Sequence, residues 1–273
     1  MAESAPLILL TNDDGLASPG LAAAVRAVRD LGDLLIVAPA EQQSGMGRSM
    51  PGHYSCAITR HMLTIDGAVY PAYAVEGSPA QTVLHALLSL ADRRPALTIA
   101  GINHGENLGT GTTISGTVGA ALQAGDMGVP GLAVSLEVPP AFHYNHNSGD
   151  LVDWSPGVYF TRYFAQRLLK RGLPRGIHAV KVDIPAEATP RTPWRVTRQS
   201  SQPYYNSMTV EGELRFGVPR PLTYRVQIDW ETLEPDSDIW AFVRDRVISV
   251  TPLTLDLSGG VDLSRFTAMM NDP

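Results

Sequence analysis

Short apolar runs alternate along the chain with longer stretches in which apolar residues recur at helical spacing. Each apolar run has the length and composition of a strand that is buried on both faces. The runs lie at residues 7–10, 34–38, 97–100, 131–136 and 178–183. The stretches with helical spacing predict amphipathic helices at residues 19–31, 79–91, 115–124 and 155–170. Strand and helix therefore alternate through most of the chain, which predicts a parallel sheet with helices on both faces.

Three Ser-Pro pairs mark the starts of predicted helices. They are Ser18-Pro19, Ser78-Pro79 and Ser155-Pro156. A serine before a helix can cap it, because its side-chain oxygen accepts a hydrogen bond from the first turn. Proline is well tolerated at the first helical position, where the N–H that it lacks would have no partner.

Two parts of the chain depart from the alternation. Residues 51–76 lack helical periodicity and alternate weakly, which predicts a small β excursion. From residue 190 onward helical periodicity is lost, and short extended stretches are separated by Pro and Gly. These stretches lie at residues 194–197, 224–228 and 247–250. We therefore predict a core over residues 1–189 and, over residues 190–273, an extended β-rich arm that packs on the core or on another subunit.

Composition narrows the class of protein. Of the 273 residues, 44% are hydrophobic and 18% are charged, which favours a globular protein. The formal net charge of -6 argues against binding to duplex nucleic acid but not against binding of a small phosphate ester. No run approaches the roughly 18 apolar residues of a membrane-spanning helix. The lone cysteine, Cys56, is most simply a small buried apolar residue. We expect a cytoplasmic protein.

Two adjacent carboxylates, Asp13 and Asp14, follow directly after the first apolar run. Ligands of an open parallel sheet bind beyond the carboxyl ends of its strands, so this pair is placed for chemistry. Two like charges held side by side repel each other, and a bound cation allows both to stay ionised. A solvated turn at residues 13–15 is the alternative interpretation, because Asp and Gly are ordinary turn residues.

Two further loops leave the same predicted edge of the sheet. Residues 39–50 form a polar loop that contains glycine and Ser44. Residues 101–109 combine glycines, which allow tight turns and close approach to a ligand, with the side-chain amides of Asn103 and Asn107. Both loops therefore bring hard oxygen donors toward the carboxylate pair.

A helix start at Ser115, Gly116 and Thr117 adds an anion site to this edge. Free N–H groups and the positive end of the helix dipole favour a bound phosphate there. Oxygen ligands beside it suit Mg²⁺ or Mn²⁺ better than zinc, because neither the cysteine nor the histidines have zinc-ligand spacing. A cation beside a phosphate indicates hydrolysis of a phosphomonoester.

Other enzyme classes fit the sequence less well. Residues 101–109 are rich in glycine but lack the GxGxxG spacing of a dinucleotide-binding loop and lie far from the first strand. A haloacid-dehalogenase-type phosphatase needs two aspartates that are separated by one residue, whereas Asp13 and Asp14 are adjacent. Neither class is therefore favoured.

Several other polar side chains are expected to be solvated. His143 and His146 are predicted to be a solvated loop pair, with metal ligation as the alternative. A surface role is predicted for His104. Glu41 and Arg48 are predicted to be exposed charges, with contact between Arg48 and a substrate phosphate as the alternative.

Four motifs in order carry a resemblance to a known family. They are TNDDG, APAEQQSG, GINHGENLG and SGTVGAAL. This order resembles the SurE family, the survival-protein-E nucleotidases, and residues 246–253 are similar to that family's closing strand motif. The resemblance covers nearly the whole chain. It implies a Rossmann-like, mostly parallel sheet with helices on both faces and a C-terminal β-hairpin arm that mediates homodimers or homotetramers.

The same resemblance implies a metal-dependent phosphatase that acts on nucleoside 5′- and 3′-monophosphates. The family's metal ligands, for one Mg²⁺ or Mn²⁺ ion per subunit, fall on Asp13, Asp14, Ser44 and Asn103. The residues around its phosphate fall on Asn107, Ser115, Gly116 and Thr117. We expect Asp13 and Asp14 to be the catalytic pair, one of them positioning the attacking water, and no covalent enzyme intermediate.

The chain departs from the family pattern in two places. Ile114 stands where family members usually have an aromatic residue, which bears on the pocket wall. Residues 224–245 match only loosely, which bears on the quaternary structure.

Two functional hypotheses of different class follow. The first is a divalent-metal nucleotidase, and the second is a nucleotide- or phosphate-binding protein on the same fold without turnover. The pair of aspartates favours the first, because a protein that only binds an anion has little use for two carboxylates beside it. Base preference, the choice between 5′- and 3′-phosphates, and the choice between Mg²⁺ and Mn²⁺ have no signature in the residues.

Overall fold

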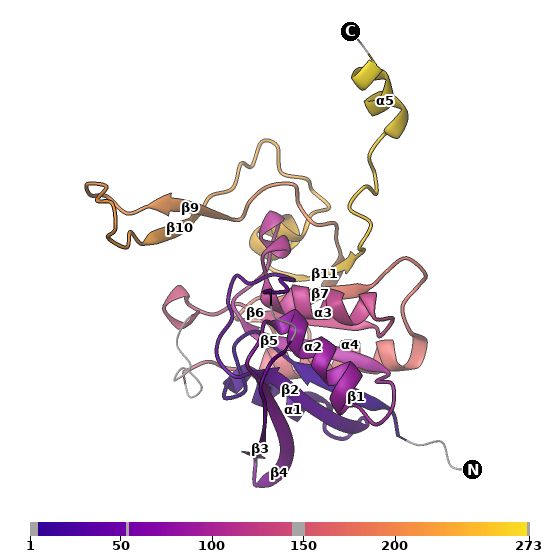
Figure 1. Cartoon of the computed structure of the whole chain (residues 1–273). Helices are drawn as coiled ribbons and strands as arrows, with labels where there is room; N and C mark the ends of the chain where they lie inside the picture. The colour runs from indigo at the N-terminus through magenta and orange to yellow at the C-terminus, as the bar shows by residue number, and fades with distance from the viewer. Residues whose placement is uncertain (1–4, 53–54, 144–150, 272–273) are drawn as a thin grey trace.

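The computed structural model describes residues 5–52, 55–143 and 151–271. Its strands are β1 (Leu7–Thr11), β2 (Asp33–Pro39), β3 (Ile58–Ile65), β4 (Ala68–Val75), β5 (Leu97–His104), β6 (Gly131–Leu136), β7 (Ala179–Ile184), β8 (Trp194–Val196), β9 (Tyr205–Thr209), β10 (Leu222–Val226) and β11 (Ile248–Leu253). Its α-helices are α1 (Pro19–Val28), α2 (Pro79–His85), α3 (Gly116–Asp126), α4 (Ser155–Arg171) and α5 (Leu263–Asn271). Figure 1 shows these elements along the chain.

Within the described residues, nine strands form one sheet in the order β3-β4-β2-β1-β5-β6-β7-β11-β8. The six central strands from β4 to β7 run parallel to one another. At the edges, β3 pairs antiparallel with β4, and β11 pairs antiparallel with β7. The α/β fold with a mostly parallel sheet is therefore confirmed.

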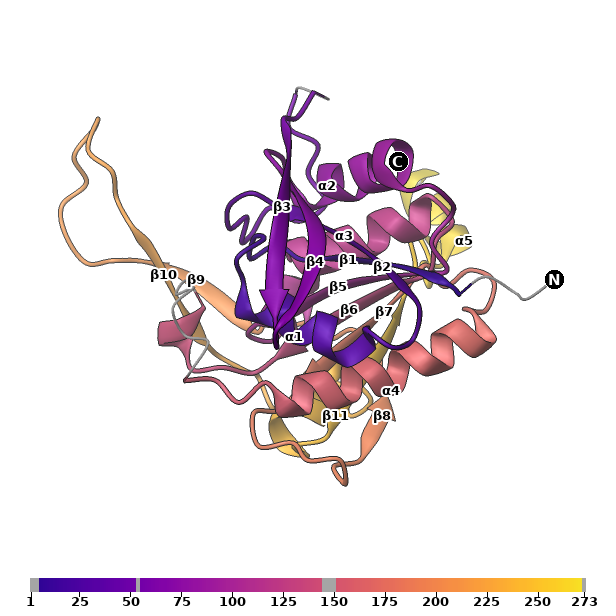
Figure 2. The ribbon, with the colours of Figure 1, turned by 90° about the horizontal axis from the view of Figure 1, so that it is seen from below.

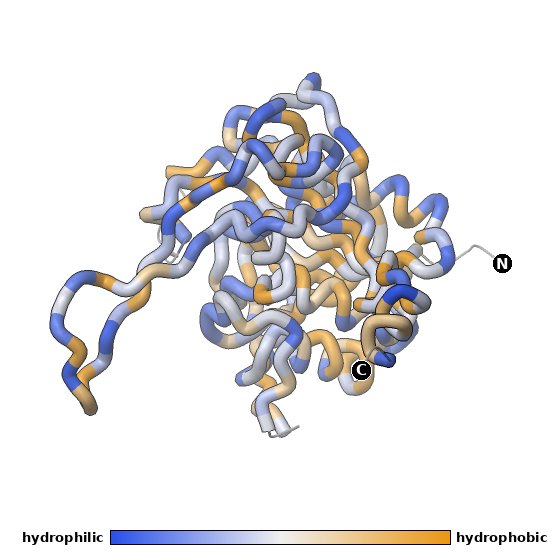
Figure 3. The backbone as a smooth tube through the Cα atoms, turned by 90° about the horizontal axis from the view of Figure 1, so that it is seen from above, coloured by the Kyte–Doolittle hydropathy of each residue, from blue (hydrophilic) through white to orange (hydrophobic). Residues whose placement is uncertain are grey.

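Helices cover both faces of the sheet. Side chains of β1 alternate between the two faces, so Ile8 and Leu10 join a core with α1 and α4, whereas Leu9 joins a core with α2 and α3. Figure 2 shows the two helix pairs on opposite sides of the strands. In Figure 3 the hydrophobic positions gather along the central strands. The apolar runs of the sequence are the strands buried between these layers.

The Ser-Pro pairs lie at helix starts, as predicted. The hydroxyl of Ser18 accepts a hydrogen bond from the backbone N of Gly20 at 3.1 Å. Ser78 accepts one from the backbone N of Gln81, also at 3.1 Å. Ser155 is the first residue of α4. The loops before α1 and α2 are thereby fixed at their last residue, whereas α4 has Trp154 at its N-cap and no side-chain cap.

The β excursion predicted at residues 51–76 is the β3–β4 hairpin. A second hairpin, formed by β9 and β10 after residue 190, extends away from the sheet in Figure 1. Residues beyond 190 do not all belong to this projection, because β8 and β11 are strands of the main sheet. The division at residues 189 and 190 stays a prediction.

The predicted loss of helical structure after residue 190 is wrong at two places. A π-helical turn spans Trp240–Arg244, and α5 spans Leu263–Asn271. Apolar residues recur at helical spacing in α5, yet the helix has no buried residue and contributes nothing to the core. In the described parts of the chain, no helix has the length and apolar character needed to cross a membrane.

Candidate active site

Loops from three neighbouring strands meet beyond the carboxyl edge of the sheet. β1, β2 and β5 are adjacent and parallel, so the segments that follow them emerge together. They form part of the lining of an open cavity of about 290 Å³. We call five of its lining residues the phosphate wall: Asp13, Ser44, Asn103, Asn107 and Ser115. The structure thus brings five of the eight predicted site residues to one cavity.

Asp13 is packed directly against the start of α3. Its side chain accepts a hydrogen bond from the hydroxyl of Thr117, and it is only 4% exposed. A Cβ added at Gly116 would lie 2.7 Å from the Asp13 carboxylate, so only glycine fits there without a shift. Gly116 and Thr117 therefore join the site through Asp13.

The charge of Asp13 is poorly compensated. Burial, followed by the neighbouring charge of Asp14, raises the pKa of Asp13 to about 7, although the hydrogen bond from Thr117 opposes this rise. Two carboxylates in this setting favour a cation beside them.

The carboxylate of Asp14 contacts the imidazole of His104. The Nδ1 atom of His104 lies 3.0 Å from Oδ2 of Asp14, and the ring of His104 meets Trp154 edge-on at 4.8 Å between centroids. The prediction of a surface role for His104 is wrong, because this side chain is only 6% exposed. The reason is that β5 extends past Ala100 and carries His104 into the protein.

Gln42 links two of the predicted metal ligands, the carboxylate of Asp14 and the hydroxyl of Ser44. Its Nε2 atom donates to Oγ of Ser44 at 2.9 Å and to Oδ1 of Asp14 at 3.2 Å. The backbone oxygen of His143 also lies 2.9 Å from this nitrogen, so its two N–H groups are shared among three oxygen atoms. Three oxygen atoms thus converge on one point beside the carboxylate pair. Gln42 was not predicted from the sequence.

Asn107 is positioned by hydrogen bonds to Ser135 of β6 and Asp183 of β7. Its backbone N donates to Oδ1 of Asp183 at 2.7 Å, and its side-chain nitrogen donates to Oγ of Ser135 at 2.8 Å. Across the cavity, the Ser115 hydroxyl accepts a hydrogen bond from the backbone N of Val118 at 3.2 Å and caps α3. The amide and the helix start predicted to hold phosphate are both fixed in place.

A buried ion network lies behind the Asn107 loop. Nζ of Lys181 lies 2.5 Å from Oδ2 of Asp183 and 3.0 Å from Oδ2 of Asp238, and all three side chains are fully buried. Asp238 also accepts a hydrogen bond from the backbone N of Gly109 at 3.1 Å. The two carboxylates therefore tie both ends of residues 107–109 to one lysine, a role that the sequence analysis missed.

The same cavity is also lined by His143 and three residues of the β9–β10 hairpin, Tyr205, Ser207 and Tyr224. We call these four residues the aromatic wall. The prediction that His143 is solvated is wrong, because its side chain is partly buried and its Nδ1 atom lies 2.9 Å from the hydroxyl of Tyr224. His146 lies outside the described residues.

Comparison with known proteins assigns a family. The family model described as survival protein SurE matches residues 8–206. The chain belongs to the SurE family. It is 38% identical over 258 residues to the 5′-nucleotidase SurE of Thermococcus gammatolerans, covering 94% of this chain and 93% of the relative. It is also 38% identical over 257 residues to the 5′-nucleotidase SurE of Methanocella arvoryzae, covering 92% of each chain.

A solved SurE structure has the same fold. The crystal structure of the SurE protein from Aquifex aeolicus matches with a TM-score of 0.75 and 28% sequence identity. The match covers 97% of this chain and 100% of that chain. The SurE fold therefore extends over nearly the whole chain.

The donor set of this SurE site fits a hard cation. Asp13, Asp14, Ser44 and Asn103 offer carboxylate, hydroxyl and amide oxygens, which are the ligands that Mg²⁺ and Mn²⁺ prefer. Among the described residues, no group of three or more His, Cys, Asp or Glu side chains is arranged to hold a metal ion. A cation here would therefore depend on the mixed oxygen set, together with water and substrate.

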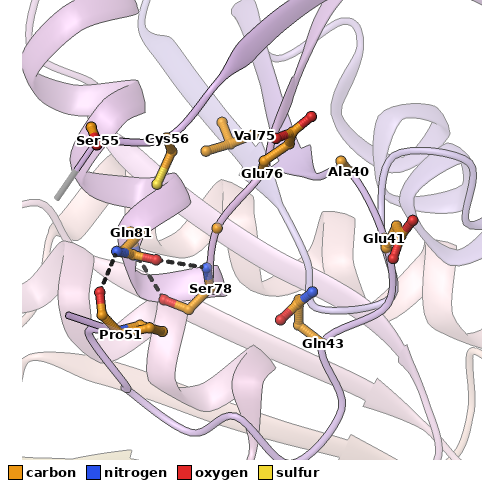
Figure 4. A pocket seen from close by; sticks show the side chains of 11 residues that line it. Ala40, Glu41, Gln43, Pro51, Ser55, Cys56, Val75, Glu76, Ser78 and Gln81 are labelled. Carbon is orange, nitrogen blue, oxygen red and sulfur yellow. Dashed lines mark hydrogen bonds between the residues drawn. The ribbon is translucent and has the colours of Figure 1, made fainter. Parts of the chain in front are cut away.

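Other polar residues of the SurE chain lie away from the phosphate wall. Arg48 donates to Gln123 at 2.8 Å and pairs with Asp126 at the far end of α3. Glu41 and Cys56 line a separate cavity of about 570 Å³ at the start of α2, shown in Figure 4. Cys56 is only partly buried, and burial raises the pKa of its thiol.

Ile114, 63% exposed, lines the same cavity as the phosphate wall.

Proposed function

We propose that the chain is a 5′-nucleotidase, a divalent-metal-dependent phosphomonoesterase that releases phosphate from nucleoside 5′-monophosphates and 3′-monophosphates. The observation that carries the proposal is one cavity lined by a buried carboxylate, oxygen donors from two further loops and the start of α3. Its SurE relatives from Thermococcus and Methanocella are named 5′-nucleotidases.

Four side chains would hold the cation: Asp13, Asp14, Ser44 and Asn103. When bound, a divalent cation supplies positive charge to the phosphate oxygens and makes water a better nucleophile. His104 keeps the carboxylate of Asp14 in one orientation through a contact of 3.0 Å. Gln42 fixes Ser44 relative to Asp14 by donating to both.

The phosphate would lie between Asn107 and the first turn of α3. The helix start at Ser115, Gly116 and Thr117 favours an anion through its N–H groups and its dipole. One of the two aspartates would orient the attacking water, which displaces the nucleoside directly from phosphorus without a covalent enzyme intermediate.

The second candidate is a nucleotide- or phosphate-binding protein without turnover. It is less well supported, because Asp13 is buried beside Asp14 and both carboxylates oppose a bound anion unless a cation accompanies it. A protein selected only to bind phosphate gains nothing from that pair.

The test is phosphate release from nucleoside 5′- and 3′-monophosphates in Mg²⁺, in Mn²⁺ and in EDTA. We expect release that is lost in EDTA and restored by excess metal. Release that persists unchanged in EDTA contradicts the role of the metal. Nucleotide binding without release under any of these conditions supports the second candidate.

We further propose a cytoplasmic homodimer or homotetramer. The β9–β10 hairpin and the C-terminal segment carry large apolar side chains in water, including Phe216 at 93% exposure and Leu257 at 92%. Such patches mark interaction surfaces. Light scattering of the full chain and of Phe216→Ser measures whether the hairpin holds subunits together.

A further inference from the structure

The aromatic wall is the part of the cavity that phosphate chemistry does not explain. It lines the same space of about 290 Å³ as the phosphate wall, yet it carries rings and a hydroxyl in place of carboxylates and amides. Ligand pockets fall in the range of roughly 300–1,000 Å³. A cavity at the lower end of that range suits a single small ligand that spans both walls.

Strand register places the hairpin residues of the wall on one face. Tyr224 of β10 lies opposite Ser207 of β9, and Tyr205 is two residues before Ser207. Side chains two apart on a strand point the same way, and so do directly opposed side chains. Tyr205, Ser207 and Tyr224 therefore turn toward the cavity as a group.

Hydroxyl contacts hold both tyrosine rings in fixed orientations. The hydroxyl of Tyr205 donates to Oε1 of Glu106 at 2.5 Å, and the hydroxyl of Tyr224 lies 2.9 Å from Nδ1 of His143. The two rings meet edge to face at 4.9 Å between centroids. Aromatic groups that are already oriented lose little conformational freedom when a ligand binds.

Neighbouring Tyr204 has a structural role and serves as a comparison for Tyr205 and Tyr224. It is 6% exposed and packs in a core with Leu108, Ile239 and Phe242. Tyr205 and Tyr224 are only half-buried and line the cavity. Their ring surface is therefore available to a ligand in a way that the ring of Tyr204 is not.

We propose that the aromatic wall is the nucleobase subsite, which stacks the base of a nucleoside monophosphate whose phosphate lies against Asn107 and the start of α3. The proposal rests on the proposed function, because that function supplies the nucleotide. Every base has a π face, so stacking contributes affinity without reading the base edge. We therefore expect affinity for purine and pyrimidine nucleotides alike.

The experiment compares two probes that share a phosphate and a ribose and differ in the base. Dissociation constants for adenosine 5′-monophosphate and ribose 5-phosphate are measured by calorimetry in EDTA, so that turnover does not interfere. Removal of the cation weakens the phosphate contact of both probes equally, so the ratio of the two constants reports on the base. The proteins are the unaltered chain, Tyr224→Ala, Tyr224→Phe and Leu222→Ala. Leu222 lies on the same strand, is 70% exposed and is outside the cavity, so its variant controls for a weakened hairpin.

We expect the unaltered chain to bind the nucleotide about tenfold more tightly than ribose 5-phosphate. Tyr224→Ala should reduce that ratio to about one, whereas Tyr224→Phe and Leu222→Ala should retain most of it. A ratio near one in the unaltered chain, or an unchanged ratio in Tyr224→Ala, overturns the subsite.

The outcome also separates this proposal from the proposed function. Tighter binding of the nucleotide that depends on Tyr224, without phosphate release in Mg²⁺ or Mn²⁺, contradicts the nucleotidase and keeps the subsite. Release from both probes at equal kcat/KM, with equal affinities, keeps the phosphatase and removes the subsite.

Discussion

The two walls of the cavity are built in different ways. The phosphate wall comes from loops between central strands, and its Asp13 is 4% exposed and held by the start of α3. The aromatic wall comes mainly from a two-stranded hairpin that stands away from the sheet, and its tyrosines are half-buried. Two strands alone are marginally stable, whereas a packed parallel sheet is rigid. Groups that must oppose charge at fixed distances thus lie on the packed sheet, whereas the rings proposed to stack lie on a hairpin and are oriented by their hydroxyl contacts.

The buried ion network is the deepest support of the phosphate wall, so breaking it should have the largest effect. Lys181→Met removes the positive charge from between Asp183 and Asp238 and leaves two carboxylates buried without a partner. Removing one partner of a buried ion pair costs about 3–5 kcal/mol of the free energy of unfolding. Urea unfolding measures this loss.

Exposed Lys170 provides the matched control, and Lys170→Met should change the free energy of unfolding by less than about 0.5 kcal/mol. If the Lys181→Met variant unfolds within 1 kcal/mol of the unaltered chain, roughly the scale of an ordinary substitution, the network does not support the loop.

Loss of a carboxylate from the phosphate wall should cost activity more than stability. We expect Asp13→Ala to lower kcat for nucleoside monophosphates by on the order of 100- to 1,000-fold, because it removes a ligand of the cation. Steady-state phosphate release measures kcat. Asp92→Ala, at a side chain that is 75% exposed, should leave kcat unchanged. Full activity in Asp13→Ala would show that the chemistry occurs elsewhere.

Metal binding should distinguish the two walls directly. At a concentration of Mn²⁺ that is 100-fold above its dissociation constant, we expect the free energy of unfolding to rise by about 2.7 kcal/mol. The gain should disappear in Asp13→Ala and persist in Tyr224→Ala, because the proposed ligands are Asp14 and residues of the phosphate wall, and none lies on the aromatic wall. Urea unfolding with and without Mn²⁺ measures it. Equal gains in both variants would place the ion outside this cavity.

The sequence alone could place the phosphate wall because each of its parts has a local signal. Asp13 follows an apolar run, Ser44 follows another, and Ser115 caps a helix. Parallel strands that lie side by side bring such ends to one edge, so local patterns suffice once the alternation of strand and helix is seen.

The supports of the wall have no comparable signal. His104 contacts Asp14 across 90 residues of sequence, and Lys181 contacts Asp238 across 57. The one available hint was charge inside an apolar run, since Lys181 and Asp183 lie within β7 and buried charges must be paired. That hint shows that a partner exists but not which residue it is.

In the β9–β10 hairpin too, contacts between residues far apart in the sequence could not be predicted. β10 was predicted at residues 224–228 and spans Leu222–Val226, whereas β9 was not predicted at all. The edge-to-face contact between Tyr205 and Tyr224 depends on the register between these strands, which a long connecting loop does not specify. The aromatic wall therefore became visible only in the structure.

Glu106 lines the cavity and accepts a hydrogen bond from Tyr205 of the aromatic wall. Its titration should have the smallest effect on the free energy of unfolding. Burial raises the pKa of Glu106, although the hydroxyl of Tyr205 donates to its carboxylate and opposes the rise. The folded chain therefore holds this proton more tightly than the unfolded chain does. The resulting stability is fully present below the ordinary pKa of about 4.5 and is lost as the pH rises through the folded value.

Glu106→Gln should remove this part of the pH dependence. In EDTA, the free energy of unfolding of the unaltered chain should fall more steeply above pH 4.5 than that of the variant, by at most about 1.4 kcal/mol per pH unit. Urea unfolding at several pH values measures the difference. Glu213→Gln, on the exposed part of the hairpin, should follow the unaltered chain. If the Glu106→Gln curve runs parallel to that of the unaltered chain, the carboxylate titrates alike in both states, and the contact with Tyr205 offsets its burial.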